Sequence, residues 1–146
     1  MLEKLLENYQ VILASKSPRR HHLLKEIGVK FLVQVPEEIE ENYPLHLTVE
    51  EIPVFLANLK TSPFHGKLKK GDILITADTI VALDGNIIGK PTDREDAKET
   101  LKRLSGKKHE VITGVCIMDQ EKSITFSSSS RVYFRELEEK EINYYV

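Results

Sequence analysis

The residues best suited to chemistry lie in the stretch 73–93. Apolar residues 73–77 predict a buried strand, which ends in Asp78 and Thr79, a carboxylate beside a hydroxyl. Apolar residues resume at 80–83, and the Asp-Gly-Asn at 84–86 favours positive φ, which predicts a hairpin whose second strand leads to Lys90. An aspartate inside a buried strand needs a partner. We therefore expect Asp78 and Lys90, an anion and a cation on neighbouring strands, to begin a functional site.

A second group of polar residues follows the apolar run at 11–14. Ser17 can cap a helix, and Pro18 suits its first position. The free N–H groups of this helix start, together with Ser15, Arg19 and Arg20, are typical of a phosphate site. The alternative is a capped helix with two solvated arginines. Cations in a first turn oppose the helix dipole, which favours the anion site.

The segments between these two groups predict supporting elements. His21 and His22 are adjacent on a helix and point in different directions, which predicts surface residues rather than metal ligands. Residues 31–35 predict a strand, and the following loop 36–42 contains four glutamates, one of which could reach a metal. A capping box at Thr48 predicts a helix that either kinks at Pro53 or starts near residue 52. Its end carries Lys60, where a cation also suits the dipole.

The remainder of the chain continues the alternation of strands and helices. A capping box at residues 92–95 starts a helix with an apolar face at 97, 101 and 104, which ends at Ser105-Gly106. Strands over 111–118 and 123–134, joined by a turn at 119–122, predict a hairpin pair. The last helix, around residue 138, reaches Val146 without a stop signal, which suggests a missing C-terminal continuation. We expect one α/β domain over residues 1–146.

Composition and known motifs exclude several classes of protein. The 146 residues are 40% hydrophobic and 30% charged with a net charge of −2, so the basic surface of a general nucleic-acid binder is missing. No apolar run is long enough for a membrane span, the N-terminus lacks the pattern of a signal peptide, and the lone Cys116 rules out an internal disulfide. Together these features predict a cytoplasmic protein. Residues 85–92 differ from a Walker A loop by one residue too few between the glycines and by Pro91. Oxygen ligands and cations remain, a set that suits Mg²⁺ and phosphate.

Five blocks of the chain together resemble one protein family. They are LASKSPRRHHLLKEIG, LANLK, ADTIVALDGNIIGKP, LSGKKHEVITGV and RVYFRELEEKEI. In this order they resemble the Maf family of nucleoside triphosphate pyrophosphatases. The resemblance implies an α/β fold, a twisted mixed sheet flanked by helices, in two lobes with a central cleft. It also implies hydrolysis of the α–β phosphoanhydride of a nucleoside triphosphate, a divalent metal cation (Mg or Mn), and, as in many members, a homodimer.

The resemblance assigns roles to individual residues. Asp78 matches the proposed proton acceptor and, with Glu41, the metal site. The ADT block resembles the branch that acts on dTTP and UTP. The remaining matches are substrate-binding positions, of which Arg19 and Thr79 are linked to base selection and Ser15, Lys60 and Lys90 to the phosphates.

Two classes of function follow from the resemblance. The first is a house-cleaning pyrophosphatase acting on dTTP, UTP or modified pyrimidine nucleotides. The second is a non-catalytic nucleotide-binding protein or a regulator of septum formation, because the family continues with a pocket-forming block where this chain ends. Thr61, where the family usually has alanine, is a further departure.

Overall fold

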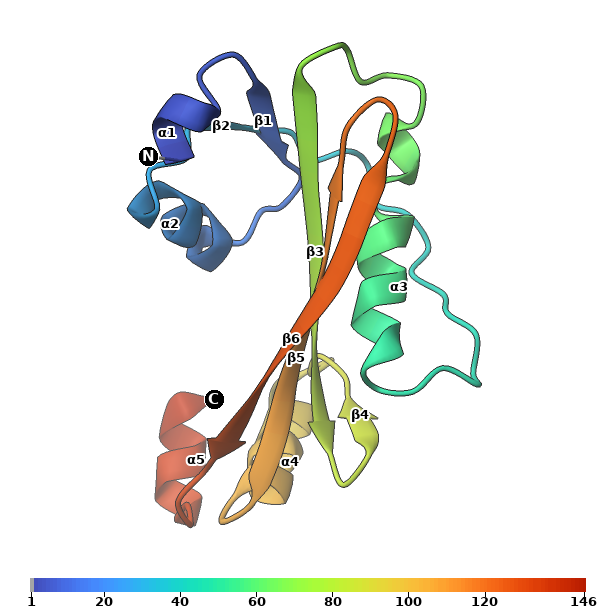
Figure 1. Cartoon of the computed structure of the whole chain (residues 1–146). Coiled ribbons are helices and arrows are strands. Elements are labelled where there is room, and N and C mark those ends of the chain that lie inside the picture. The colour runs from blue at the N-terminus through green and yellow to red at the C-terminus, as the bar shows by residue number, and fades with distance from the viewer. Residues whose placement is uncertain (1) are drawn as a thin grey trace. The chain divides into compact units, whose positions relative to one another are not determined.

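The computed structural model describes residues 2–146, along which helices are interspersed with strands (Figure 1). The helices are α1 (Leu2–Leu5), α2 (Pro18–Glu26), α3 (Glu51–Leu59), the short 3-10 helix η1 (Ser62–Phe64), α4 (Arg94–Leu104) and α5 (Glu139–Tyr145). The strands are β1 (Gln10–Leu13), β2 (Phe31–Val33), β3 (Asp72–Leu83), β4 (Asn86–Ile88), β5 (Lys108–Met118) and β6 (Ser123–Tyr133). None of the described helices is long and apolar enough to cross a membrane.

The six strands form one mixed sheet in the order β2-β1-β3-β5-β6, with β4 paired to β3. β1 runs parallel to both β2 and β3, whereas β4 pairs with β3 in the antiparallel direction. Parallel strands need crossover connections, which α2 and the segment containing α3 supply. The predicted class, α/β with a mixed sheet and flanking helices, is confirmed.

The chain divides into two compact units, which we describe separately. The first contains the chain up to Asp78 together with Gly114–Ser127, and the second contains Thr79–Thr113 and Ser128–Val146. Strands β3, β5 and β6 therefore each contribute to both units.

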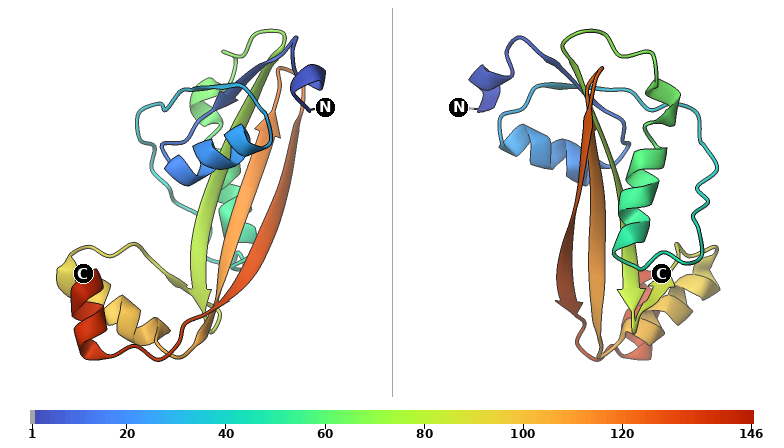
Figure 2. Two further views of the ribbon diagram at one scale, coloured as in Figure 1. Left: turned by 90° about the vertical axis from the view of Figure 1, so that its left-hand side faces the viewer. Right: turned by 45° about the vertical axis from the view of Figure 1, so that its right-hand side comes forward.

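The first unit packs α3 against its strands. In Figure 2, α3 lies on one face of this part of the sheet and α2 on the other. The buried hydroxyl of Thr76 donates to the carbonyl of Ala57 at 2.6 Å, which ties β3 to α3. A Cβ built at Gly114 on β5 would collide with the backbone of Pro53 and Val54, so only glycine allows this close approach of helix and strand.

Helix α2 begins as its sequence predicts. Ser17 Oγ accepts from the N–H of Arg20, and Pro18 is the first helical residue. Its apolar side chains, however, are only partly covered: Leu24 is half-buried, but Leu23 and Ile27 are 54% and 58% exposed. The start of this helix is therefore defined by its capping residues, and its apolar side chains contribute little buried surface.

Helix α3 resolves the two alternatives left open by Pro53. Thr48 and Glu51 make the two reciprocal hydrogen bonds of the predicted box: the N–H of Thr48 donates to Glu51 Oε1 at 3.0 Å and the N–H of Glu51 to Thr48 Oγ1 at 3.3 Å. Thr48 is nevertheless not the cap of the helix, because the residue directly before the helix is Glu50, whose side chain makes no cap bond. The helix starts at Glu51, so Pro53 lies in the first turn, where a missing N–H leaves no hydrogen bond unmade. The later start is confirmed.

The second unit has its own small core of Leu83, Ile88 and Leu104. The predicted turn after β3 is present, with positive φ at Asp84 (51°) and Gly85 (78°). α5 contacts α4 and starts directly after Glu138, near the predicted position, where Glu138 and Glu141 form a capping box.

The start of α4 corrects the predicted capping box by one residue. The cap is Asp93, whose Oδ1 accepts from the N–H of Asp96 at 2.7 Å, and not Thr92. Thr92 instead donates its own N–H to Asp96 Oδ2 at 2.9 Å. Aspartate is a stronger N-cap than threonine, and the carboxylate of Asp96 in the first turn can accept the N–H of Thr92. The helix therefore starts one residue later than predicted.

Candidate active site

Lys60 joins two carboxylates of the first unit. It follows the last residue of α3, and its Nζ lies 2.7 Å from Asp78 Oδ1 on β3 and 3.2 Å from Glu41 Oε1 in the acidic loop. The same ammonium donates to the carbonyl oxygen of Ala77 at 3.3 Å. Lys60 therefore does more than complement the dipole at the C-terminus of α3, because it also forms ion pairs with Asp78 and Glu41.

Arg20 approaches the same point of β3 from α2. Its Nη1 donates to the carbonyl oxygen of Ala77 at 3.2 Å and to Ser15 Oγ at 3.2 Å. The carbonyl of Ala77 thus accepts from both Arg20 and Lys60, immediately before Asp78. Two cations from helices on either side of the strand converge beside one carboxylate.

The electrostatics of Arg20 suit an anion site. Burial lowers the pKa of Arg20, and the negative charge of Asp78 opposes part of this change. A guanidinium that has lost part of its water gains more from a bound anion than a fully hydrated one.

Arg20 is the functional candidate to which the sequence interpretation gave no role of its own. Both arginines were expected at the phosphate site, but the resemblance assigns a role only to Arg19, which is exposed. The available signal was helical spacing: Arg20 lies three residues after the cap Ser17, so the two share a helix face. The assignment of Arg19 to base selection stays a prediction.

Thr79 and Lys90 belong to the second unit. Thr79 Oγ1 lies 2.9 Å from Thr113 Oγ1, so one hydroxyl donates to the other. Lys90 is exposed and follows the end of β4 by two residues. The expected pairing of Lys90 with Asp78 and the substrate roles of both residues stay predictions.

Asp78 and Glu41 are the carboxylates that could hold the divalent metal implied by the resemblance. Asp78 and Glu41 lie close enough for one ammonium to contact both, so they can present oxygens to one small cation. No group of three or more His, Cys, Asp or Glu residues with metal-binding geometry occurs among residues 2–146. Two carboxylates fit Mg²⁺, because this ion commonly takes its other ligands from phosphate and water.

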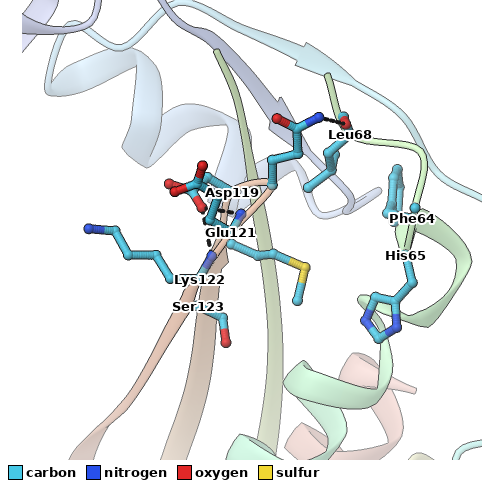
Figure 3. A pocket seen from close by; sticks show the side chains of 10 residues that line it. Phe64, His65, Leu68, Asp119, Glu121, Lys122 and Ser123 are labelled. Atoms are coloured by element: carbon cyan, nitrogen blue, oxygen red, sulfur yellow. Dashed lines mark hydrogen bonds between the residues drawn. The ribbon is translucent and has the colours of Figure 1, made fainter. Parts of the chain in front are cut away.

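A separate hollow of about 330 Å³ lies elsewhere in the first unit. Figure 3 shows the β5–β6 turn, with Asp119 and Lys122, opposite Phe64 and His65 near η1. Gln120 Nε2 ties this turn to the carbonyl of Leu68 at 3.2 Å. None of the predicted site residues lines this hollow, so it is distinct from the group around Asp78.

The fold has counterparts among solved structures. The Staphylococcus aureus Ham1 protein superposes with a TM-score of 0.52 at 14% identity, covering 84% of this chain and 70% of that one. A HAM1 protein from Coxiella burnetii gives a TM-score of 0.52 at 17% identity, covering 84% of this chain and 71% of that one. These similarities define the class of the fold.

Sequence comparison identifies the family. The profile of the family described as Maf-like protein matches residues 10–146. A dTTP/UTP pyrophosphatase of Bacteroides thetaiotaomicron is 46% identical over 141 residues, 97% of this chain and 73% of its own length. A dTTP/UTP pyrophosphatase of Phocaeicola vulgatus is 47% identical over 146 residues, the whole of this chain and 75% of its own length. The chain belongs to the Maf family.

Proposed function

We propose that this protein hydrolyses nucleoside triphosphates, dTTP and UTP foremost, to the monophosphate and pyrophosphate. One observation carries the proposal: Arg20 and Lys60 converge on the Ala77–Asp78 segment of β3, with Glu41 beside Lys60. This arrangement combines charge to neutralise phosphates with a carboxylate that can receive a proton. The names of the relatives, dTTP/UTP pyrophosphatases, support the choice of substrate.

In the proposed reaction, a water oxygen bonds to the α-phosphorus, and the bond from this phosphorus to the bridging oxygen of the β-phosphate breaks. The electron pair of that bond leaves with pyrophosphate. Lys60 holds Asp78 through Oδ1, so we assign Oδ2 as the atom that accepts the proton of the water. Lys60 thereby fixes the orientation of the base.

Positive charge supplies the remaining stabilisation. Arg20 and Lys60 offset the charge that develops on the leaving pyrophosphate, and the free N–H groups at the start of α2 add to them. A divalent metal held by Asp78 and Glu41 would supply additional charge neutralisation at the phosphate oxygens. The resemblance adds Ser15 as a phosphate contact, which its position beside Arg20 supports.

The finer parts of the proposal concern selectivity and cellular setting. Arg19 and Thr79 would select the base, as the resemblance implies. We further propose action in the cytoplasm, which the sequence features predict only in combination, and a homodimer like many members of the family.

Product analysis tests the proposed function. The purified protein is incubated with dTTP and Mg²⁺, and the products are separated by ion-exchange chromatography. We expect dTMP and pyrophosphate in equal amounts. dTDP with inorganic phosphate would contradict α–β cleavage, and binding of dTTP without turnover would support the alternative, a nucleotide-binding regulator.

A further inference from the structure

His21 occupies a position that the sequence interpretation did not foresee. It was expected on the surface, but its side chain is partly buried and its Nε2 lies 2.6 Å from the carbonyl oxygen of Ser15. Its ring also packs near that of Phe31 on β2, with centroids 5.9 Å apart and planes inclined by 53°. His22, by contrast, is exposed and pairs with Glu26 at 2.9 Å, as expected for a surface residue.

The contact fixes the protonation of one ring nitrogen. A carbonyl oxygen only accepts hydrogen bonds, so Nε2 of His21 carries a hydrogen and donates it to Ser15. The donor comes from the first turn of α2, and the acceptor lies in the loop that enters this helix. His21 therefore closes the β1–α2 loop back onto its own helix.

This closure determines the position of a residue at the proposed phosphate site. Ser15 is buried, and its hydroxyl accepts from the N–H of Ser17 at 3.1 Å and from Arg20 Nη1 at 3.2 Å. His21 holds the carbonyl of the same residue. The hydroxyl and the carbonyl of Ser15 are thus restrained, and through the hydroxyl so is the guanidinium that reaches Ala77.

We propose that His21 is a positioning residue for the reaction: its Nε2–H holds Ser15, and Ser15 in turn fixes Arg20 beside Asp78. The inference rests on the proposed function. It assigns to His21 no contact with the substrate. Small displacements of a charged group reduce stabilisation of the transition state more than they reduce binding of the substrate, so the turnover number should carry the effect.

Three variants separate the hydrogen bond from the shape of the ring. His21→Phe keeps an aromatic ring beside Phe31 but lacks the donor, His21→Gln places an amide N–H close to the position of Nε2, and His21→Asn is too short to do so. His22→Phe is the matched control at the neighbouring exposed histidine. Circular dichroism and urea unfolding establish that each variant is folded before kinetics are compared.

We expect kcat for dTTP to fall about tenfold in His21→Phe and His21→Asn, with KM nearly unchanged, since a hydrogen bond contributes about this factor. His21→Gln should stay within about threefold of the original protein for the same reason, and His22→Phe should match it. If His21→Phe fails to fold, His21→Asn against His21→Gln decides the matter. Equal activity of these two variants, or an unchanged kcat in His21→Phe, would overturn the proposal.

Amide exchange of Ser17 provides a readout that does not depend on turnover. Its N–H donates to Ser15 Oγ, so exchange measured by NMR should be faster in His21→Phe and close to the original rate in His21→Gln. If the unaltered protein releases no pyrophosphate, the proposed function fails. The exchange rate of the Ser17 amide still tests whether His21 restrains Ser15. Equal exchange in all variants would overturn the positioning role.

Discussion

Replacing Lys60 by methionine is the perturbation whose effect the structure defines most fully. Methionine keeps an unbranched apolar chain of similar length but removes the charge shared by Asp78, Glu41 and the carbonyl of Ala77. If Lys60 both orients the base and neutralises the leaving group, the variant loses two contributions at once. We expect kcat/KM to fall by about 10²–10³, the cost of removing one group that stabilises charge in a transition state.

The expected loss of stability follows from the geometry of the ion pair. At 2.7 Å and an effective dielectric constant of about 20, the gross attraction between Lys60 and Asp78 is about 6 kcal/mol. Desolvation and lost side-chain freedom offset most of it. The side chains are 26% and 14% exposed, between the surface and buried limits, so the free energy of unfolding should fall by about 1–3 kcal/mol.

The assay combines pyrophosphate release from dTTP with urea denaturation. Lys67→Met is the matched control, because Lys67 is an exposed lysine of the same unit and forms none of the ion pairs seen among residues 2–146. The control should keep its activity and change stability by less than about 0.5 kcal/mol. A Lys60→Met variant within twofold of the original kcat/KM would refute the role given to this residue.

Three further predictions concern packing and ionisation. Gly114→Ala places a Cβ against the backbone of Pro53 and should cost about 3 kcal/mol or more in urea unfolding, whereas Gly89→Ala, with open space around it, should not. Burial raises the pKa of the Cys116 thiol, so maleimide should label it only after unfolding, and labelling of the folded protein would contradict this packing. The N–H of Thr48 holds the pKa of Glu51 below its ordinary value near 4.5, so its contribution to stability is present above that pH and is lost as the pH falls through the lower folded value. The free energy of unfolding should therefore fall less steeply at low pH in Glu51→Gln than in the original protein. Identical pH profiles would contradict the hydrogen bonding between Thr48 and Glu51.

Local signals predicted the elements well because each has a local physical cause. The cap at Ser17, the turn at Asp84-Gly85 and the Thr48 box all depend on residues within four positions of one another. The error at Thr92 shows the limit: two adjacent residues could both cap α4, and only the geometry of Asp93 and Asp96 decides between them.

The contacts of the candidate site were not predictable from local patterns. The residue types at the start of α2 predict phosphate binding, which stays a prediction, whereas the choice between Arg19 and Arg20 depends on where β3 lies. Likewise, the sequence of the loop does not show which of its four glutamates lies at the site. Glu41 is distinguished by Lys60, a residue from a different element whose reach no local pattern encodes.

The most direct test of the central claim is the release of pyrophosphate from dTTP by Asp78→Asn. This change keeps the size of the side chain but removes the carboxylate that is proposed to accept the proton. Asp72→Asn on the same strand, where the carboxylate receives the N–H of Lys69, is the control. We predict that Asp78→Asn stays folded, binds dTTP and releases no measurable pyrophosphate, while Asp72→Asn remains active. An Asp78→Asn protein that turns over dTTP at the original rate would contradict the account.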